Sequence, residues 1–210
     1  MLSLVNRYKI VPILRGMKLE DALFIVDCFQ EAQLNVLEVS LNQPNSLEVL
    51  EKLEMEFGKD MTIGAGTVLN KEIAKEAENA GAAFFLGPNV SKEVAEIASK
   101  LKVPYIPGAL SPTEIQYANE LGAELIKVFP VRQLGASYIK DVLASLNKVN
   151  LLAVGGVSSK NLGEFFLAGV KGVGVGSSLF EEEWIEKRDS KKIIERLENL
   201  KKVANEKKEV

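Results

Sequence analysis

The sequence has 210 residues, 47% of them hydrophobic and 26% charged, which fits a single domain with one sizeable core. Its net charge of −3 gives no reason to expect a nucleic acid or a membrane as a partner, and no apolar run is long enough to cross a bilayer. With no histidine and one cysteine, the chain is not expected to bind a metal tightly, and a Ser-His-Asp triad is excluded.

Short apolar segments alternate with longer segments of helical periodicity along the chain. The predicted strands are Lys9–Leu14, Val36–Ser40, Thr62–Gly64, Ala83–Gly87, Pro104–Pro107, Leu125–Phe129, Leu151–Val154 and Gly172–Val175. The predicted helices are Leu19–Ala32, Asn70–Ala80, Ser91–Leu101, Pro112–Leu121, Ser158–Ala168 and an outer C-terminal helix, Ser190–Val210, whose last residues are expected to fray. Strands begin roughly 20–27 residues apart, which is about one βα unit each.

Several predicted helices begin and end at residues typical of helix caps. Candidate N-terminal caps are Asn45 or Ser46, Asn70, Ser91, Ser111 and Ser158. Glycines at predicted C-terminal ends are Gly58, Gly81, Gly122 and Gly169.

Eight βα units in this length predict one (β/α)8 (TIM) barrel domain over residues 1–210. An open, doubly wound sheet is the alternative, but no GxGxxG motif follows the first predicted strand. The amino-terminal sequence has no signal-peptide pattern, and Cys28 cannot form an intramolecular disulfide, so a cytoplasmic location is expected. Active sites of such barrels lie at the carboxyl ends of the strands, and this rule selects the candidate residues.

Lys127 and Glu38 are charged residues within apolar strands. Strand alternation places Lys127 on the face of Leu125 and Phe129, and Glu38 on the face of Ser40. Burial inside a barrel would lower the pKa of Lys127, and a neutral amine can attack a carbonyl to form an imine. Glu38 would form an ion pair with Lys127 or act with it in acid–base chemistry. A structural Lys–Glu pair is the alternative.

Other strand ends carry groups suited to binding anions. Arg15 could hold a carboxylate or a phosphate, unless it is an ordinary surface arginine. Gly155-Gly156 and Gly176-Ser177 follow the last two strands, where barrels often bind phosphate through backbone N–H groups. Tight turns without a ligand are the alternative for these glycines.

These motifs, in this order, resemble the 2-keto-3-deoxy-6-phosphogluconate/6-phosphogalactonate aldolase family. They are Val11-Pro-Ile-Leu-Arg15, Leu37-Glu-Val-Ser40, Ile63-Gly-Ala-Gly-Thr-Val68, Pro88-Asn89, Pro107-Gly108, Ile126-Lys-Val-Phe-Pro130, Val154-Gly-Gly-Val157 and Gly174-Val-Gly-Ser177. The resemblance spans all eight predicted strands. It implies a homotrimeric class I aldolase that cleaves a 2-dehydro-3-deoxy-6-phospho sugar acid to pyruvate and glyceraldehyde 3-phosphate, without a metal or an organic cofactor.

The same resemblance implies residue roles. Lys127 matches the Schiff-base lysine, and Glu38 matches the glutamate that moves protons. Pocket residues are matched by Arg15, Thr67, Pro88 and Phe129. The phosphate cradle is matched by Gly155, Gly156, Gly176 and Ser177.

Two departures bear on the substrate. Asn42 stands where gluconate-type members usually have an arginine, and Ala153-Val154 stands where they usually have Pro-Thr. Both departures favour the galactonate branch, and a branch that accepts both C4 epimers is the alternative. The sequence does not decide whether shorter keto acids such as 4-hydroxy-2-oxoglutarate are also cleaved. The alternative functions are a phosphosugar isomerase, a barrel like thiamine-phosphate synthase, and a non-catalytic sugar-phosphate binder.

Overall fold

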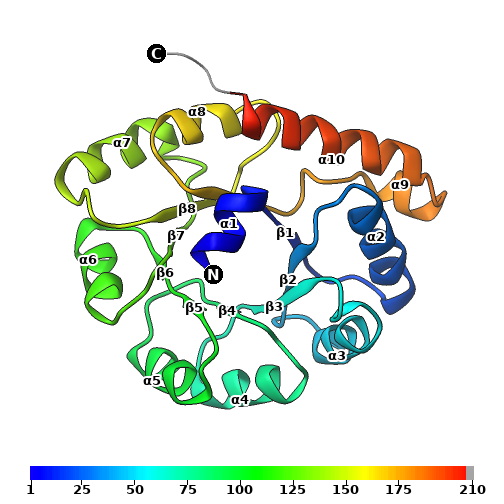
Figure 1. The fold of residues 1–210 in the computed structure, drawn as a ribbon, viewed down its shortest axis with the longest axis horizontal. Coiled ribbons are helices and arrows are strands. Elements are labelled where there is room, and N and C mark those ends of the chain that lie inside the picture. Colours follow the sequence, from blue (N-terminus) through cyan, green and yellow to red (C-terminus); the bar gives the residue numbers. More distant parts are fainter. Residues whose placement is uncertain (207–210) are drawn as a thin grey trace.

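The computed structural model describes residues 1–206, in which parallel strands form a barrel surrounded by helices (Figure 1). The strands are β1 (Ile10–Leu14), β2 (Val36–Ser40), β3 (Thr62–Gly66), β4 (Phe85–Leu86), β5 (Tyr105–Ile106), β6 (Gly108–Ala109), β7 (Ile126–Val128), β8 (Leu151–Val154) and β9 (Gly172–Val175). The helices are α1 (Leu2–Tyr8), α2 (Leu19–Glu31), α3 (Ser46–Phe57), α4 (Lys71–Asn79), α5 (Lys92–Leu101), α6 (Pro112–Glu120), α7 (Gly135–Ser145), α8 (Leu162–Leu167), α9 (Glu182–Glu186) and α10 (Ser190–Asn205).

The strands pair in the order β5-β4-β3-β2-β1-β9-β8-β7-β6, and every pairing is parallel. β5 and β6 stand at opposite ends of this order but are separated in the chain by Pro107 alone. β5 lies within the predicted fifth strand, Pro104–Pro107, and β6 extends the chain just beyond its end, so the sheet closes on itself there. The prediction of a (β/α)8 barrel is confirmed.

The strands are covered on both faces, which explains why they appear in the sequence as continuous apolar runs. All residues of β2 and of β8 are buried, with the barrel interior on one face and the helices on the other. Helix α2 shows how the outer layer packs, because Ala22, Ile25, Val26 and Phe29 on one of its faces are all 0% exposed.

Four of the predicted N-terminal caps stand at the start of a helix, and Asn45 of α3 is the one among them whose side chain forms no capping hydrogen bond. The side chains of Asn70, Ser91 and Ser111 each accept a hydrogen bond from a backbone N–H in the first turn of α4, α5 and α6. The prediction for Ser158 is wrong, because α8 begins at Leu162. The Asn161 side chain instead accepts a hydrogen bond from the Ser158 N–H, which forms a turn before the helix.

The two terminal helices pack on the barrel in different ways. Helix α1 lies against β1 and β9, where Val5 packs against Gly172 at the start of β9. Helix α10 lies outside the barrel against α2 and α8 (Figure 1). It occupies Ser190–Asn205 of the predicted 190–210, and residues 207–210 lie outside the described residues.

Cys28 on α2 is 2% exposed, and its burial raises the pKa of the thiol to about 11.

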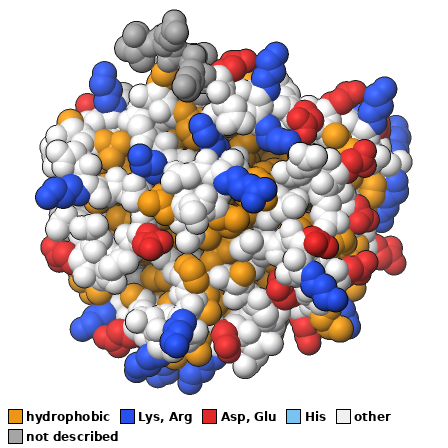
Figure 2. Space-filling view, viewed as in Figure 1, with side chains coloured by type: hydrophobic (Ala, Val, Ile, Leu, Met, Phe, Trp, Pro, Cys, Tyr) orange, Lys and Arg blue, Asp and Glu red, His pale blue; other side chains and the backbone are white. Residues whose placement is uncertain are grey.

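Lys and Arg side chains are interspersed with Asp and Glu around the face shown in Figure 2, in keeping with the small net charge. Within residues 1–206, no helix combines the length and the apolar character needed to span a bilayer.

Candidate active site

A cavity of about 680 Å³ opens at the carboxyl ends of β1, β7, β8 and β9. Six residues predicted for the site line it: Arg15, Phe129, Gly155, Gly156, Gly176 and Ser177. Gly155 and Gly156 have φ values of +93° and +89°, a conformation that glycine adopts without strain. The four residues predicted as a phosphate cradle therefore lie together on one cavity, at the position where barrels of this kind hold anions.

Lys127 lies in the middle of β7, paired with Gly108 of β6 and Leu152 of β8. Its side chain is 5% exposed, and its Nζ lies 4.7 Å from the centre of the Phe129 ring, which also lines the cavity. Burial lowers the pKa of the Lys127 amine, and the nearby Arg15 charge lowers it further, while Glu38 opposes both effects. The environment therefore favours the neutral amine.

Glu38 lies in β2, paired with Ile13 of β1 and Gly64 of β3. It is 1% exposed and packs directly over Gly66, where an added Cβ would lie 1.5 Å from the Glu38 Oε1. Burial raises the pKa of the Glu38 carboxyl, and the charges of Lys127 and Arg15 only oppose this effect. Gly66 thus supplies the space in which the buried carboxyl group of Glu38 is held.

The charges of the Lys127 and Glu38 side chains act on each other. Each influences the pKa of the other, but among the ion pairs of residues 1–206 none joins them directly. The Glu38 Oε2 is buried and has no hydrogen-bond partner among the described residues. The direct ion pair offered as one interpretation of the sequence is therefore not formed, and burial shifts the pKa of each group toward its neutral form.

Thr67 and Pro88 follow β3 and β4 and are not among the residues that line the 680 Å³ cavity. The Thr67 Oγ1 lies 2.8 Å from the Ser40 Oγ, which in turn donates a hydrogen bond to the Asn42 Oδ1 at 3.2 Å. The Pro88 backbone is packed against Gly108, where an added Cβ would lie 2.4 Å from the Pro88 carbonyl carbon. Both residues thus have close partners on neighbouring segments at the strand ends.

The structure also places residues on the cavity that the sequence analysis did not select. Met17, Arg132, Gln133 and Phe180 all line it. Arg132 lies two residues beyond Pro130, so a search that extended past the end of the strand into the following loop would have included it.

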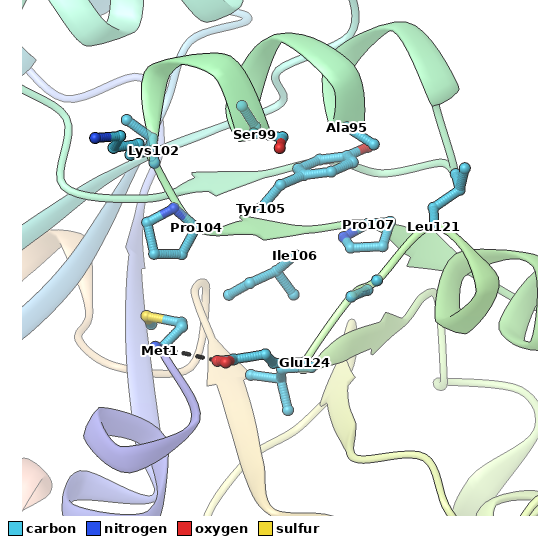
Figure 3. Close-up of a pocket in the computed structure, with 15 residues that line it drawn as sticks. Met1, Ala95, Ser99, Lys102, Pro104, Tyr105, Ile106, Pro107, Leu121 and Glu124 are labelled. Atoms are coloured by element: carbon cyan, nitrogen blue, oxygen red, sulfur yellow. Dashed lines mark ion pairs between the residues drawn. The ribbon is translucent and has the colours of Figure 1, made fainter.

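A second cavity, of about 500 Å³, lies at the amino ends of β5 and β7 (Figure 3). Its lining includes Tyr105 and Glu124, and the Met1 amine lies 3.6 Å from the Glu124 carboxylate. None of the residues predicted for the site lines this cavity. The candidate active site is therefore the cavity at the carboxyl ends.

Comparison with known proteins agrees with this geometry. The family model for KDPG and KHG aldolase matches residues 2–196. The chain belongs to the KDPG and KHG aldolase family. It is accordingly a lyase that breaks carbon–carbon bonds.

Curated relatives in the KDPG and KHG aldolase family carry two kinds of name. The chain is 34% identical to a 2-dehydro-3-deoxy-6-phosphogalactonate aldolase of Escherichia coli, a match that covers 83% of this chain and 86% of the relative. It is 31% identical to a 2-dehydro-3-deoxy-phosphogluconate aldolase of Treponema pallidum, covering 77% of each.

Solved structures of KDPG aldolases are similar to the whole barrel. A KDPG aldolase from Legionella pneumophila, with pyruvate captured as a covalent carbinolamine, superposes with a TM-score of 0.86 at 30% identity, covering 93% of this chain and 95% of that one. A thiamine phosphate pyrophosphorylase from Pyrococcus furiosus superposes with a TM-score of 0.64 at 20% identity, covering 92% of this chain and 98% of that one. That second likeness is one of fold alone.

Proposed function

We propose that the chain is a class I aldolase that cleaves a 2-dehydro-3-deoxy-6-phospho sugar acid to pyruvate and glyceraldehyde 3-phosphate. The observation that carries the proposal is the buried Lys127, whose pKa is lowered, near a buried Glu38 whose pKa is raised. Lys127 lies in β7, whose carboxyl end opens on the candidate site, and Glu38 lies in β2, which pairs with β1 beside that cavity. A neutral amine and a proton donor are what imine formation requires.

In the proposed reaction, the Lys127 Nζ attacks the C2 carbonyl of the substrate to form a carbinolamine. Glu38 donates a proton to the departing hydroxyl, which leaves as water, and a protonated imine results. This cation withdraws electrons from the C3–C4 bond while the C4 hydroxyl returns a proton to Glu38. The bond breaks, glyceraldehyde 3-phosphate leaves, and the remaining enamine is protonated at C3 and hydrolysed to pyruvate and free Lys127.

The phosphate end of the substrate is assigned to Gly155, Gly156, Gly176 and Ser177. These four residues line the same cavity as Phe129, whose ring centre lies 4.7 Å from the Lys127 Nζ. Holding the phosphate there fixes the distance of the C3–C4 bond from the amine. Arg15 is assigned to an anionic group of the substrate, and its charge acts on the pKa of both Lys127 and Glu38.

The preferred C4 epimer is proposed to be the galactonate form. Asn42 accepts a hydrogen bond from Ser40 at the end of β2, so a neutral amide rather than a cation stands near the strand that carries Glu38. The relative of Escherichia coli named for the phosphogalactonate substrate is 34% identical to this chain. Kinetics with both epimeric phosphates would test the preference, and a higher kcat/KM for the gluconate form would contradict it.

Trapping with borohydride tests the imine directly. Incubation with pyruvate and sodium borohydride should attach a reduced pyruvyl group to Lys127, located by mass spectrometry of peptides. Lys127→Ala should lose both the adduct and the cleavage activity because no other group is assigned to form the imine.

The matched control is Lys140→Ala, which removes an exposed lysine on α7 and should retain both properties. Active enzyme that gives no adduct, or a Lys127→Ala variant that still releases pyruvate, would refute the mechanism.

The remaining proposals concern assembly and location. A designed cage built by fusing symmetric oligomeric domains superposes with a TM-score of 0.85 at 30% identity, covering 94% of this chain and 73% of that one. This likeness and the family resemblance support a homotrimer. The single, buried cysteine fits a reducing compartment, and the cytoplasm is the proposed location.

A further inference from the structure

The cavity assigned to the substrate has a second cation besides Arg15. Arg132 also lines it, and no Asp or Glu belongs to its lining. The charged side chains on this cavity are therefore two arginines, which suits a doubly charged anion better than a singly charged one.

Arg15 and Arg132 also differ from the other arginines of the chain. Arg188 forms an ion pair with Asp21 at 2.8 Å, Arg196 forms one with Glu181 at 3.5 Å, and Arg7 lies over the Tyr8 ring at 5.1 Å. Within residues 1–206, neither Arg15 nor Arg132 has a carboxylate or an aromatic partner. Both are free to bind a ligand.

The position of Arg132 assigns it to the part of the cavity proposed to bind phosphate. Its stem packs against Gly156, where an added Cβ would lie 2.8 Å from the Arg132 Cβ and 3.0 Å from its Cγ. Gly156 belongs to the predicted phosphate cradle, so Arg132, on the loop between β7 and α7, lies against the turn after β8 that carries part of this cradle. The Arg15 charge acts on the pKa of Lys127 and Glu38, whereas that of Arg132 is not among the causes of either shift.

We propose that Arg132 is a substrate-binding residue that pairs with the phosphate of the substrate and makes the enzyme selective for phosphorylated over unphosphorylated acceptors. The inference rests on the proposed function, because it assigns the phosphate to this end of the cavity. A guanidinium can donate two parallel hydrogen bonds to phosphate oxygens, and the backbone N–H groups of the cradle lack its full charge.

The test uses the condensation direction with pyruvate and either D-glyceraldehyde 3-phosphate or D-glyceraldehyde. Arg132→Gln should raise the KM for the phosphorylated aldehyde roughly 10-fold. A roughly 10-fold change is at the low end of what the loss of one charge-assisted hydrogen bond causes, as expected for an exposed side chain. The kcat and the kinetics with D-glyceraldehyde should stay within about twofold, because the reacting atoms keep their partners. Arg132→Lys should restore part of the loss.

Arg7→Gln is the matched control, since it removes an exposed arginine on α1, which packs near the amino ends of β1 and β9. It should leave both aldehydes unaffected. Equal effects of Arg132→Gln on the two aldehydes, or no effect on either, would overturn the inference while leaving the imine mechanism intact.

Binding of inorganic phosphate gives a readout that does not depend on the reaction. Phosphate should raise the melting temperature of the native protein and of Lys127→Ala, and clearly less that of Arg132→Gln. If the native protein proved inactive with every substrate, this result would still support the phosphate site. Equal stabilisation of the native protein and Arg132→Gln would count against it.

Discussion

At the scale of single residues, Lys127 and Glu38 occupy sites that suit their neutral forms. Each is almost fully buried, and burial is the largest cause of the shift in the pKa of each. Glu38 also leaves one carboxyl oxygen without a hydrogen-bond partner among the described residues. Such an oxygen is costly in a folded protein, and a substrate or a water molecule that donates a hydrogen bond to it would relieve that cost.

Arg15 affects the pKa of Lys127, whereas Arg132 is not among the causes of that shift. The pH dependence of activity should therefore differ between variants of these two arginines. The Arg15 charge lowers the pKa of Lys127, so Arg15→Gln should raise it. Because the neutral amine is the reactive form, the acidic limb of the kcat/KM profile should move to higher pH. The rate of borohydride trapping with pyruvate, measured across pH, should shift in the same direction.

Two variants control this prediction. Arg15→Lys keeps the positive charge and should leave the acidic limb close to its native position. Arg132→Gln should not move it, since Arg132 is not among the causes of the shift at Lys127. A limb that stays in place in Arg15→Gln, or moves to lower pH, would show that the Arg15 charge does not set the protonation of the amine.

At the scale of elements, α10 completes the outer helix layer by packing against α2 and α8. Its inward face is Ile193, Leu197, Leu200 and Ala204, which are at most 3% exposed. Leu197→Ala should lower the free energy of unfolding by about 2–5 kcal/mol, because it removes buried methyl groups and leaves a cavity. Urea denaturation would measure the loss.

The control on the same helix is Glu195→Ala, which changes an exposed side chain and should alter stability by less than about 0.5 kcal/mol. The kcat of Leu197→Ala should stay near the native value at temperatures where the variant is folded. A change in stability no larger than that of Glu195→Ala would mean that α10 contributes little to the barrel.

The elements that could be predicted from sequence were those with strong periodicity or a capping side chain. Helices α4, α5 and α6 begin at Asn70, Ser91 and Ser111, whose side chains form the expected hydrogen bonds. Helices α1 and α7 were not predicted, and the side chain at the N-cap of each accepts no hydrogen bond from the first turn. For α3 only the end residues, Asn45 or Ser46 and Gly58, were predicted, and the Asn45 side chain forms no such bond either. Where that local signal is missing, packing against the barrel determines the helix.

In the candidate site too, some features have a local signal in the sequence and others do not. A charge within an apolar strand indicated that Lys127 and Glu38 were special, because the two-residue period of a strand gives the face of a side chain. The separation of their charged groups could not be predicted, since it depends on rotamers and on the space above Gly66. Arg132 was missed because the folded path of the loop, rather than its sequence, brings it against Gly156.

At the scale of the whole molecule, the two ends of the barrel differ in construction. The carboxyl end has the cavity with Arg15, Arg132 and the glycine turns, whereas the amino end is contacted by α1 and includes the ion pair between Met1 and Glu124. This separation lets binding residues vary in the loops at one end while the strands and the helix at the other end keep the fold.

The proposed homotrimer is a prediction about the whole molecule. Sedimentation equilibrium should give three times the chain mass of 23.0 kDa, independent of protein concentration over the micromolar range. Apolar side chains that are exposed in the single chain, such as Leu110, Tyr117 and Leu134, offer surface that association could bury. A mass equal to one chain would reject the trimer but would leave the assignment of Lys127 untouched.

The burial of Cys28 has a practical consequence. Its thiol is almost inaccessible, and with a pKa of about 11 it carries little thiolate at neutral pH, so maleimide dyes should scarcely label the native protein. A cysteine substituted for Gln133, at the rim of the 680 Å³ cavity, would be the one readily labelled position. A fluorophore attached there would report when the cavity fills and empties during turnover.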